Sequence, residues 1–212
     1  MGTNFKPEFK YFREVITKVN SFITTIDDVY DVHGTLEELE LFTEAIESFL
    51  RPNAMAHVAH GIIGPGLDSL PYYMKICFHA LYNFVNEIAF ETLKNSGHYI
   101  TSYLKKTWAY LCKAYLIEAK WYHSGYAPTL EEYLENAWIS IGAPVIITHA
   151  YFVIPHSFKM EDLVHLEENP NIIRFSAMIL RLANDLGTYK VSWHLNLIFL
   201  LCYYKYKVFI VV

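Results

Sequence analysis

Residues 27–31 read Asp27-Asp28-Val29-Tyr30-Asp31 and close an apolar helical stretch that runs from Phe12 to Ile26. On a helix, Asp27 and Asp31 are four residues apart and project from the same face. The carboxylates of this motif repel one another, and partial burial makes their charges more costly. A divalent cation would neutralise them, and oxygen ligands in this spacing suit Mg²⁺ or Mn²⁺. The motif predicts a metal site that brings substrate phosphates with it, with a solvated acidic helix end as the alternative.

A second polar cluster lies near the other end of the chain and consists of Arg181, Asn184, Asp185 and Thr188. We predict a helix from Ile172 to Thr188, on which Asn184 and Thr188 are four residues apart and Arg181 shares their face. Oxygen-bearing side chains beside a guanidinium fork can hold a cation and a phosphate side by side. The alternative is an ordinary helix end, because Asn and Gly are common where helices stop.

The composition favours a chain with a large buried core and argues against nucleic acid as a partner. The 212 residues are 53% apolar and only 18% charged, which suits one domain with a substantial core. The net charge is −5 and no run of Lys or Arg occurs, so a nucleic-acid-binding surface is not expected. Aromatic residues make up 17% of the chain, and their rings either pack the core or surround a carbocation in a dry site. The three cysteines suggest a reducing compartment and no disulfide framework.

Helical periodicity, capping signals and chain breakers predict helices almost throughout, with no strand before the C-terminal tail. Thr35 with Glu38, and Thr129 with Glu132, have the spacing of capping boxes that begin two of these helices. Residues 140–144 include a glycine and a proline and should break or kink the helix that follows Thr129. The expected helices cover Phe12–Val32, Thr35–Phe49, Leu70–Lys94, Ile100–Ser124, Thr129–Phe152, Met160–Glu168 and Ile172–Thr188, with a loop at Arg51–Gly66.

Several segments together resemble the plant class I terpene synthases, most closely the monoterpene-forming branch of the angiosperm enzymes. The resemblance covers most of residues 5–47 and 67–190 and includes the aspartate motif with its neighbours. Four further segments contribute to it, namely Leu81–Glu87, Glu118–Tyr122, Glu131–Trp138 and Arg181–Thr188. It implies an all-α, class I terpenoid synthase-like helical bundle, incomplete in this chain, with a metal-binding catalytic domain in residues 1–190.

The resemblance implies a terpene synthase, a lyase that ionises an allylic prenyl diphosphate, here geranyl diphosphate, and forms a monoterpene. Members of this family hold three Mg²⁺ ions between the two motifs, and Mn²⁺ is an alternative ion. By that resemblance, the metal ligands of this chain are Asp27, Asp31, Asn184 and Thr188. Asp28 completes the catalytic aspartates in a supporting role, and Arg181 falls on a position that binds the substrate diphosphate.

This chain also departs from the family pattern in several places. Ser192 stands where the family has a glutamate as the third ligand of the second motif, so we expect that metal site to be weakened or absent. Residues 48–66 do not match the pattern, and residues 191–212 form an apolar, aromatic tail. We hypothesise that both segments are translated intron, and we expect the chain to be truncated at both ends relative to the family.

Two alternatives to an active enzyme follow from these departures. One is a catalytically inactive fragment that binds metal or diphosphate weakly. The other is a non-enzymatic helical protein held at a membrane by Trp193–Val212, although Lys205 and Lys207 interrupt that stretch and argue against an anchor. We expect a monomer whose partner is a small-molecule substrate. Resemblance to the family implies a plastid location, with a transit peptide absent from this chain and the cytosol as the alternative.

Overall fold

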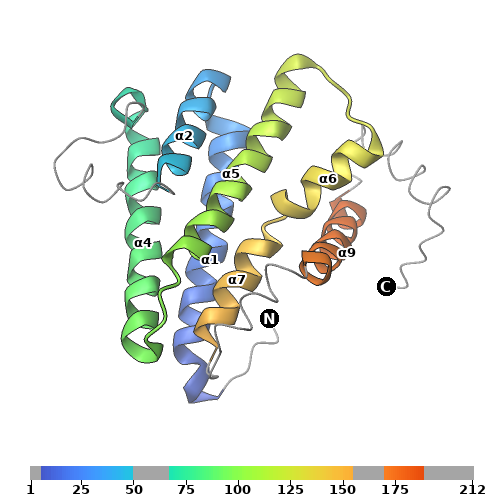
Figure 1. Ribbon diagram of the computed structural model, residues 1–212. Coiled ribbons are helices and arrows are strands. Elements are labelled where there is room, and N and C mark those ends of the chain that lie inside the picture. Colours follow the sequence, from blue (N-terminus) through green and yellow to red (C-terminus); the bar gives the residue numbers. More distant parts are fainter. Residues whose placement is uncertain (1–5, 50–66, 155–169, 189–212) are drawn as a thin grey trace.

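The computed structural model describes residues 6–49, 67–154 and 170–188, which fold as helices packed on one another (Figure 1). The chain begins with a 3₁₀ turn, Pro7–Phe9, and helix α1, Lys10–Asp28, which continues into a π turn at Val29–His33. A second 3₁₀ turn covers Leu67–Ser69. The remaining helices are α2 (Leu36–Ser48), α4 (Tyr72–Ser96), α5 (Thr101–Ser124), α6 (Leu130–Ser140), α7 (Ala143–Val153) and α9 (Pro170–Thr188). The described residues contain no strand, as the sequence predicts.

Local signals set the ends of most helices. Both predicted capping boxes form, since Thr35 accepts from the Glu38 backbone N–H and Thr129 accepts from the Glu132 backbone N–H. Each glutamate in turn accepts from the backbone N–H of its threonine, which satisfies a second donor at the helix start. At the other end, α4 and α5 stop at glycines in the left-handed region.

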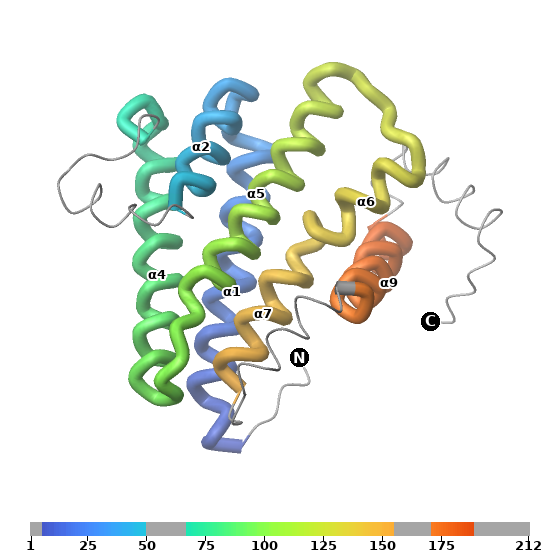
Figure 2. The backbone as a smooth tube through the Cα atoms, in the orientation of Figure 1, coloured from blue at the N-terminus to red at the C-terminus, as the bar shows by residue number. Residues whose placement is uncertain are grey.

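The predicted break within the Thr129–Phe152 helix separates α6 from α7 (Figure 2). Gly142 lies at this break with φ +77°, a conformation that glycine adopts without strain. A Cβ at this position would lie 3.0 Å from the Cδ1 atom of Ile23 on α1. The break therefore depends on glycine both for its backbone conformation and for the close approach of α1 to α7.

The core lies between α1, α2, α4, α5 and α7 and is apolar. Its fully buried side chains include Val19, Ile26, Leu81, Leu104 and Trp108. Aromatic rings stack within it, for example Phe22 on Phe84 with ring centroids 5.0 Å apart. For these rings, the structure agrees with the first of the two alternatives, in which aromatic side chains pack the core. Helix α9 packs against α6 and α7, on the side of the bundle away from α4 (Figure 1).

One described stretch, Leu130–Val153, is long and apolar enough to cross a membrane. Half of its most apolar part is buried within the bundle, and the stretch is interrupted at Gly142, which is typical of a core helix. The predictions made for Arg51–Gly66, for Met160–Glu168 and for the tail at 191–212, including Ser192, lie outside the described residues.

Candidate metal and diphosphate site

The first aspartate motif lies where α1 gives way to the π turn. Asp27 and Asp28 are the last residues of α1, and Asp31 follows within the turn. The Gly34 N–H donates to the Val29 carbonyl at 2.9 Å, a bond between residues five apart that closes the turn. Asp27 is half-buried, whereas Asp28 and Asp31 are exposed. Wide turns of this kind are frequent at functional sites, and this one carries the last carboxylate of the motif.

Tyr30 ties the π turn to the neighbouring helices. Its side chain is 4% exposed, and its hydroxyl bonds to the Thr43 hydroxyl on α2 at 2.6 Å. Thr43 donates its own proton to the Leu39 carbonyl, so Tyr30 is the donor of the pair. The Tyr30 ring also packs against Tyr115 on α5, with centroids 5.6 Å apart. The residue between the aspartates therefore fixes the turn that carries Asp31.

Partial burial and the neighbouring carboxylates disfavour the ionised forms of Asp27 and Asp31. Burial raises the pKa of Asp27, and the neighbouring charges of Asp31 and Asp28 raise it further. The Tyr115 hydroxyl and the Arg181 guanidinium lower this pKa in part. Asp31 reaches solvent, but partial desolvation by the atoms around it also raises its pKa, against a lowering by Arg181. Because Arg181 lies on α9, its effect on both pKa values shows that the second cluster lies near the first motif.

The remaining residues of the second cluster lie on α9 beside Arg181. Asn184 and Thr188 are exposed, and the Thr188 hydroxyl donates to the Asn184 carbonyl at 2.9 Å. That bond leaves the lone pairs of the Thr188 oxygen available to a ligand. Within the described residues, neither side chain hydrogen-bonds to the aspartate motif. In this part of the chain, the two clusters are connected by the electrostatic effect of Arg181 on Asp27 and Asp31.

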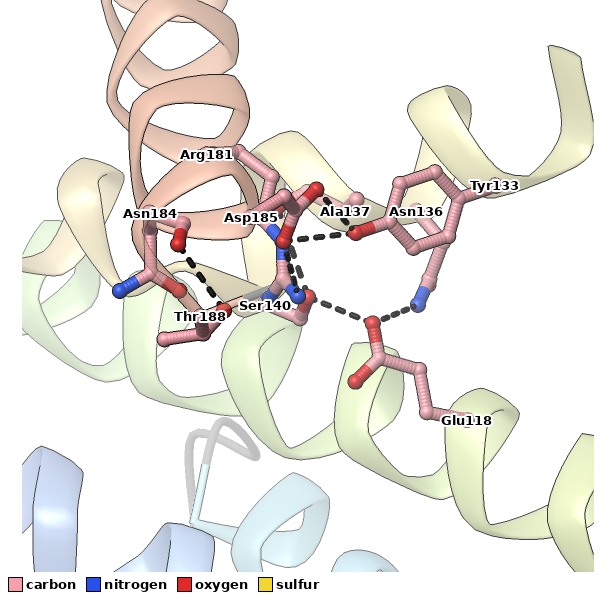
Figure 3. A network of polar contacts seen from close by, with 9 residues as sticks. All are labelled: Glu118, Tyr133, Asn136, Ala137, Ser140, Arg181, Asn184, Asp185 and Thr188. Carbon is pink, nitrogen blue, oxygen red and sulfur yellow. Dashed lines mark hydrogen bonds and ion pairs between the residues drawn. The ribbon is translucent and has the colours of Figure 1, made fainter. Parts of the chain in front are cut away.

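Arg181 is held by Tyr133, which the sequence did not single out, and by Asp185, which the sequence placed in the second cluster without a role of its own. Its Nε–H donates to the Tyr133 hydroxyl at 2.8 Å, and its Nη2 lies 2.8 Å from Oδ1 of Asp185 (Figure 3). Tyr133 donates in turn to Oδ2 of Asp185 at 2.7 Å. Burial lowers the pKa of Arg181, but the Tyr133 hydroxyl and the Asp185 carboxylate outweigh it and raise the pKa overall. The guanidinium is therefore a fixed, permanent cation.

Glu118 on α5 lies next to this network and joins α5 to the end of α6 (Figure 3). Its Oε1 accepts from the Ser140 hydroxyl at 2.6 Å and from the Asn136 amide at 3.2 Å. Burial raises the pKa of Glu118, against lowering by the Ser140 hydrogen bond and by Arg181. Ser140 is the last residue of α6, so this carboxylate fixes the helix where the α6–α7 break begins.

The chain matches a known protein family over nearly all of its length. Residues 1–207 match the model described as terpene synthase family, metal binding domain. The chain belongs to the terpene synthase family. It is 56% identical over 188 residues to terpene synthase 10 from Ricinus communis and 55% identical over 188 residues to the chloroplastic myrcene synthase from Quercus ilex.

These terpene synthase relatives are much longer than this chain. The two alignments cover 89% of this chain but 32% and 29% of the respective relatives. The chain therefore spans about a third of the length of the curated relatives that it matches. The crystal structure of isoprene synthase from grey poplar leaves (Populus x canescens), in complex with three Mg²⁺ ions and dimethylallyl-S-thiolodiphosphate, is 42% identical with a TM-score of 0.76. That match covers 89% of this chain and 33% of isoprene synthase, and it confirms the predicted all-α terpenoid synthase fold.

The donor atoms of this terpene synthase chain suit a hard divalent cation. Asp27 and Asp31 supply carboxylate oxygens whose raised pKa values reflect burial and carboxylate repulsion that a bound cation would relieve. In the part of the chain that the structure describes, no three His, Cys, Asp or Glu side chains group closely enough to form a metal site by themselves. A cation here must therefore complete its coordination with neutral oxygens or with phosphate oxygens, as Mg²⁺ commonly does.

Proposed function

We propose that this chain carries the metal and diphosphate site of a monoterpene-forming terpene synthase, with geranyl diphosphate as substrate. One observation carries the proposal. Arg181, near one end of the chain, lies close enough to Asp27 and Asp31, near the other end, to lower the pKa of both carboxylates. A guanidinium fork close to two carboxylates is a suitable arrangement for clamping divalent ions onto an anionic leaving group.

Each candidate residue has a role in this proposal. Asp27 and Asp31 hold Mg²⁺ from one side with Asp28 in support, and Asn184 and Thr188 offer oxygens from the other. Bound Mg²⁺ would neutralise the diphosphate as it leaves the allylic carbon. Arg181 binds the diphosphate oxygens through its fork of N–H donors and orients the leaving group. Three Mg²⁺ ions are bound in the isoprene synthase complex, and Mn²⁺ is an alternative ion here. Ser192 offers only a neutral hydroxyl at the last ligand position, so the corresponding ion would be held weakly.

The wider assignment follows the relatives. Their chloroplastic names support a plastid location for the complete protein. We assign the metal-binding catalytic domain to residues 1–190 and treat 48–66 and 191–212 as segments foreign to it. We further propose that the protein acts as a monomer on a small-molecule prenyl diphosphate.

The test is Mg²⁺-dependent release of pyrophosphate from geranyl diphosphate by the purified chain, with terpene products collected from the headspace. We expect Asp27→Ala to abolish release, because a methyl group cannot replace a coordinating oxygen. Glu44→Ala on α2 serves as the control, since Glu44 is exposed and lies outside the proposed site. Equal release by the parent and by Asp27→Ala would show that the site is wrongly assigned.

A catalytically inactive relative that binds metal or diphosphate weakly is the second candidate, and Ser192 at the last ligand position favours it. It predicts that pyrophosphate binds in a Mg²⁺-dependent manner but that geranyl diphosphate is not cleaved. Calorimetric titration with Mg²⁺ and pyrophosphate separates the two candidates. A chain that neither binds pyrophosphate nor cleaves the substrate would refute both.

A further inference from the structure

Tyr133, Arg181 and Asp185 form a closed triangle of two hydrogen bonds and one ion pair between α6 and α9 (Figure 3). Its three sides measure 2.8 Å from Arg181 to Tyr133, 2.7 Å from Tyr133 to Asp185 and 2.8 Å from Arg181 to Asp185. The Tyr133 hydroxyl accepts from the arginine and donates to the aspartate, so the proton positions around the ring are fixed. We call this group the arginine triangle.

The arginine triangle occupies one edge of the guanidinium and leaves the rest available. Arginine has five N–H donors in a rigid fork; the Nε–H donates to Tyr133, and Nη2 on the same edge forms the ion pair with Asp185. The guanidinium carbon also lies 5.6 Å from the Tyr133 ring centroid, so the aromatic side chain limits its movement on a second side. The side chain of Arg181 remains 21% exposed, whereas that of Asp185 is 2% exposed. The buried aspartate thus faces the protein while part of the cation faces outward.

A purely structural reason for this arrangement is weak. Removing a carboxylate and a guanidinium from water is costly, and well-packed apolar residues often replace buried ion pairs without loss of stability. What the triangle adds is a defined orientation for a long side chain that would otherwise sample many rotamers. Arg181 is also the cation whose charge reaches Asp27, Asp31 and Glu118, so its orientation matters for the whole cluster.

We propose that Tyr133 and Asp185 are positioning residues that hold the free edge of the Arg181 guanidinium ready for the diphosphate. This inference rests on the proposed function, because it assumes that Arg181 meets a diphosphate group. Neither residue needs to touch the substrate. Both act by fixing the fork before binding, which spares the ligand the entropy cost of ordering it.

Two measurements on the full chain test the proposal, one with a ligand and one without. The first is the affinity for inorganic pyrophosphate in saturating Mg²⁺, measured by calorimetry. Tyr133→Phe should weaken it about three- to tenfold, the scale of losing the pre-organisation of one long side chain. The second is NMR hydrogen exchange at the Arg181 Nε–H in the ligand-free chain, which Tyr133→Phe should accelerate at least tenfold because that donor loses its partner. The control is Tyr126→Phe, which removes a tyrosine–glutamate hydrogen bond at the exposed start of the same helix.

A double-mutant cycle separates positioning from general loosening of the bundle. In an Arg181→Gln background, Tyr133→Phe should cause no further loss of pyrophosphate affinity, because no fork remains to be oriented. Asp185→Asn, which keeps the shape but removes the charge, should behave in the same way. Equal losses in the two backgrounds, or unchanged exchange at the Arg181 Nε–H, would overturn the proposal. A third outcome is that Tyr133→Phe accelerates exchange at the Arg181 Nε–H but the parent chain binds no pyrophosphate. That outcome would confirm the contacts of the arginine triangle and refute both the proposed function and the positioning role that rests on it.

Discussion

The carboxylates at the end of α1 repel one another, and this repulsion leads to a prediction for Asp27→Asn. The effect of this substitution on the stability of the protein should change sign when metal is added. Asp27→Asn removes one charge from the motif and keeps an oxygen that the Tyr115 hydroxyl can still meet. In the metal-free protein, Asp27 is half-buried and is repelled by Asp31 on the same face. Since ionised Asp27 is disfavoured there, we expect the variant to be more stable than the parent in the absence of Mg²⁺.

The size of this effect can be worked from the contacts. A like-charge pair four residues apart costs about 0.2–0.5 kcal/mol, and Asp28 and the partial burial of Asp27 add to it. We expect a gain of about 0.5 kcal/mol, which raises the melting temperature by about 1–2 °C for a domain of this size. With Mg²⁺ and pyrophosphate at a hundred times their dissociation constant, the parent gains about 2.7 kcal/mol from binding. Asp27→Asn should lose most of that gain, so the order of stability reverses.

The assay is thermal unfolding followed by circular dichroism, with EDTA in one series and with Mg²⁺ and pyrophosphate in the other. Glu44→Gln is the matched control, because it removes one negative charge from an exposed position on α2. That variant should track the parent in both series. Equal ligand-induced shifts in the parent and in Asp27→Asn would refute the reasoning, as would a clear loss of stability of Asp27→Asn in EDTA.

Two further predictions concern the break between the helices and the buried histidine. Gly142→Ala and Gly97→Ala both force a side chain into the left-handed region, at a cost of about 1–2 kcal/mol. Only Gly142→Ala also places a Cβ at 3.0 Å from Ile23, so its midpoint in urea should fall further than that of Gly97→Ala, whose Cβ meets nothing within 4 Å. Equal midpoints would show that α7 can move away from α1. His149 is fully buried, and burial lowers its pKa to about 4 from an ordinary value of 6.5. In this pH range His149 binds a proton in the unfolded chain but not in the folded chain, so stability should fall as the pH drops from about 6.5 to about 4. The interval is worth about 3 kcal/mol at about 1.4 kcal/mol per pH unit. His149→Gln should flatten this part of the urea-unfolding profile, and an unchanged slope would show that another group is responsible.

The helices could be predicted from the sequence because their limits are set locally. The capping boxes at Thr35 and Thr129 and the break around Gly142 depend on residues within a few positions of one another, and all of them form as expected. The π turn after α1 could not be predicted in this way. It is fixed by the bond from Tyr30 to Thr43 and by packing on Tyr115, which are contacts with two other helices.

The candidate site shows the same division between local and long-range information. Spacing alone identified Asp27 with Asp31 and Asn184 with Thr188 as pairs on one helix face. Spacing alone could not bring Arg181 to the aspartates, and the resemblance to a family supplied that expectation. The sequence grouped Asp185 with Asn184, but spacing alone could not show that Asp185 is buried beside Arg181 while Asn184 is exposed. A usable signal was present, since Ala177, Arg181 and Asp185 are each four residues apart on the face of α9 that is the less exposed.

The position of Arg181 accounts for how a site with this much negative charge can fold before any metal arrives. Its guanidinium lowers the pKa of Asp27, Asp31 and Glu118, so it offsets part of the repulsion that burial would otherwise make more costly. A lysine could supply the same charge, but it could not donate to Tyr133 and pair with Asp185 along one edge and still present donors along another. The same fork can therefore serve the ligand-free protein as a counter-charge and the ligand-bound protein as a diphosphate contact. On this reasoning, the aspartate motif and the arginine triangle are two halves of one electrostatic unit, and a substitution in either half should change what the other half binds.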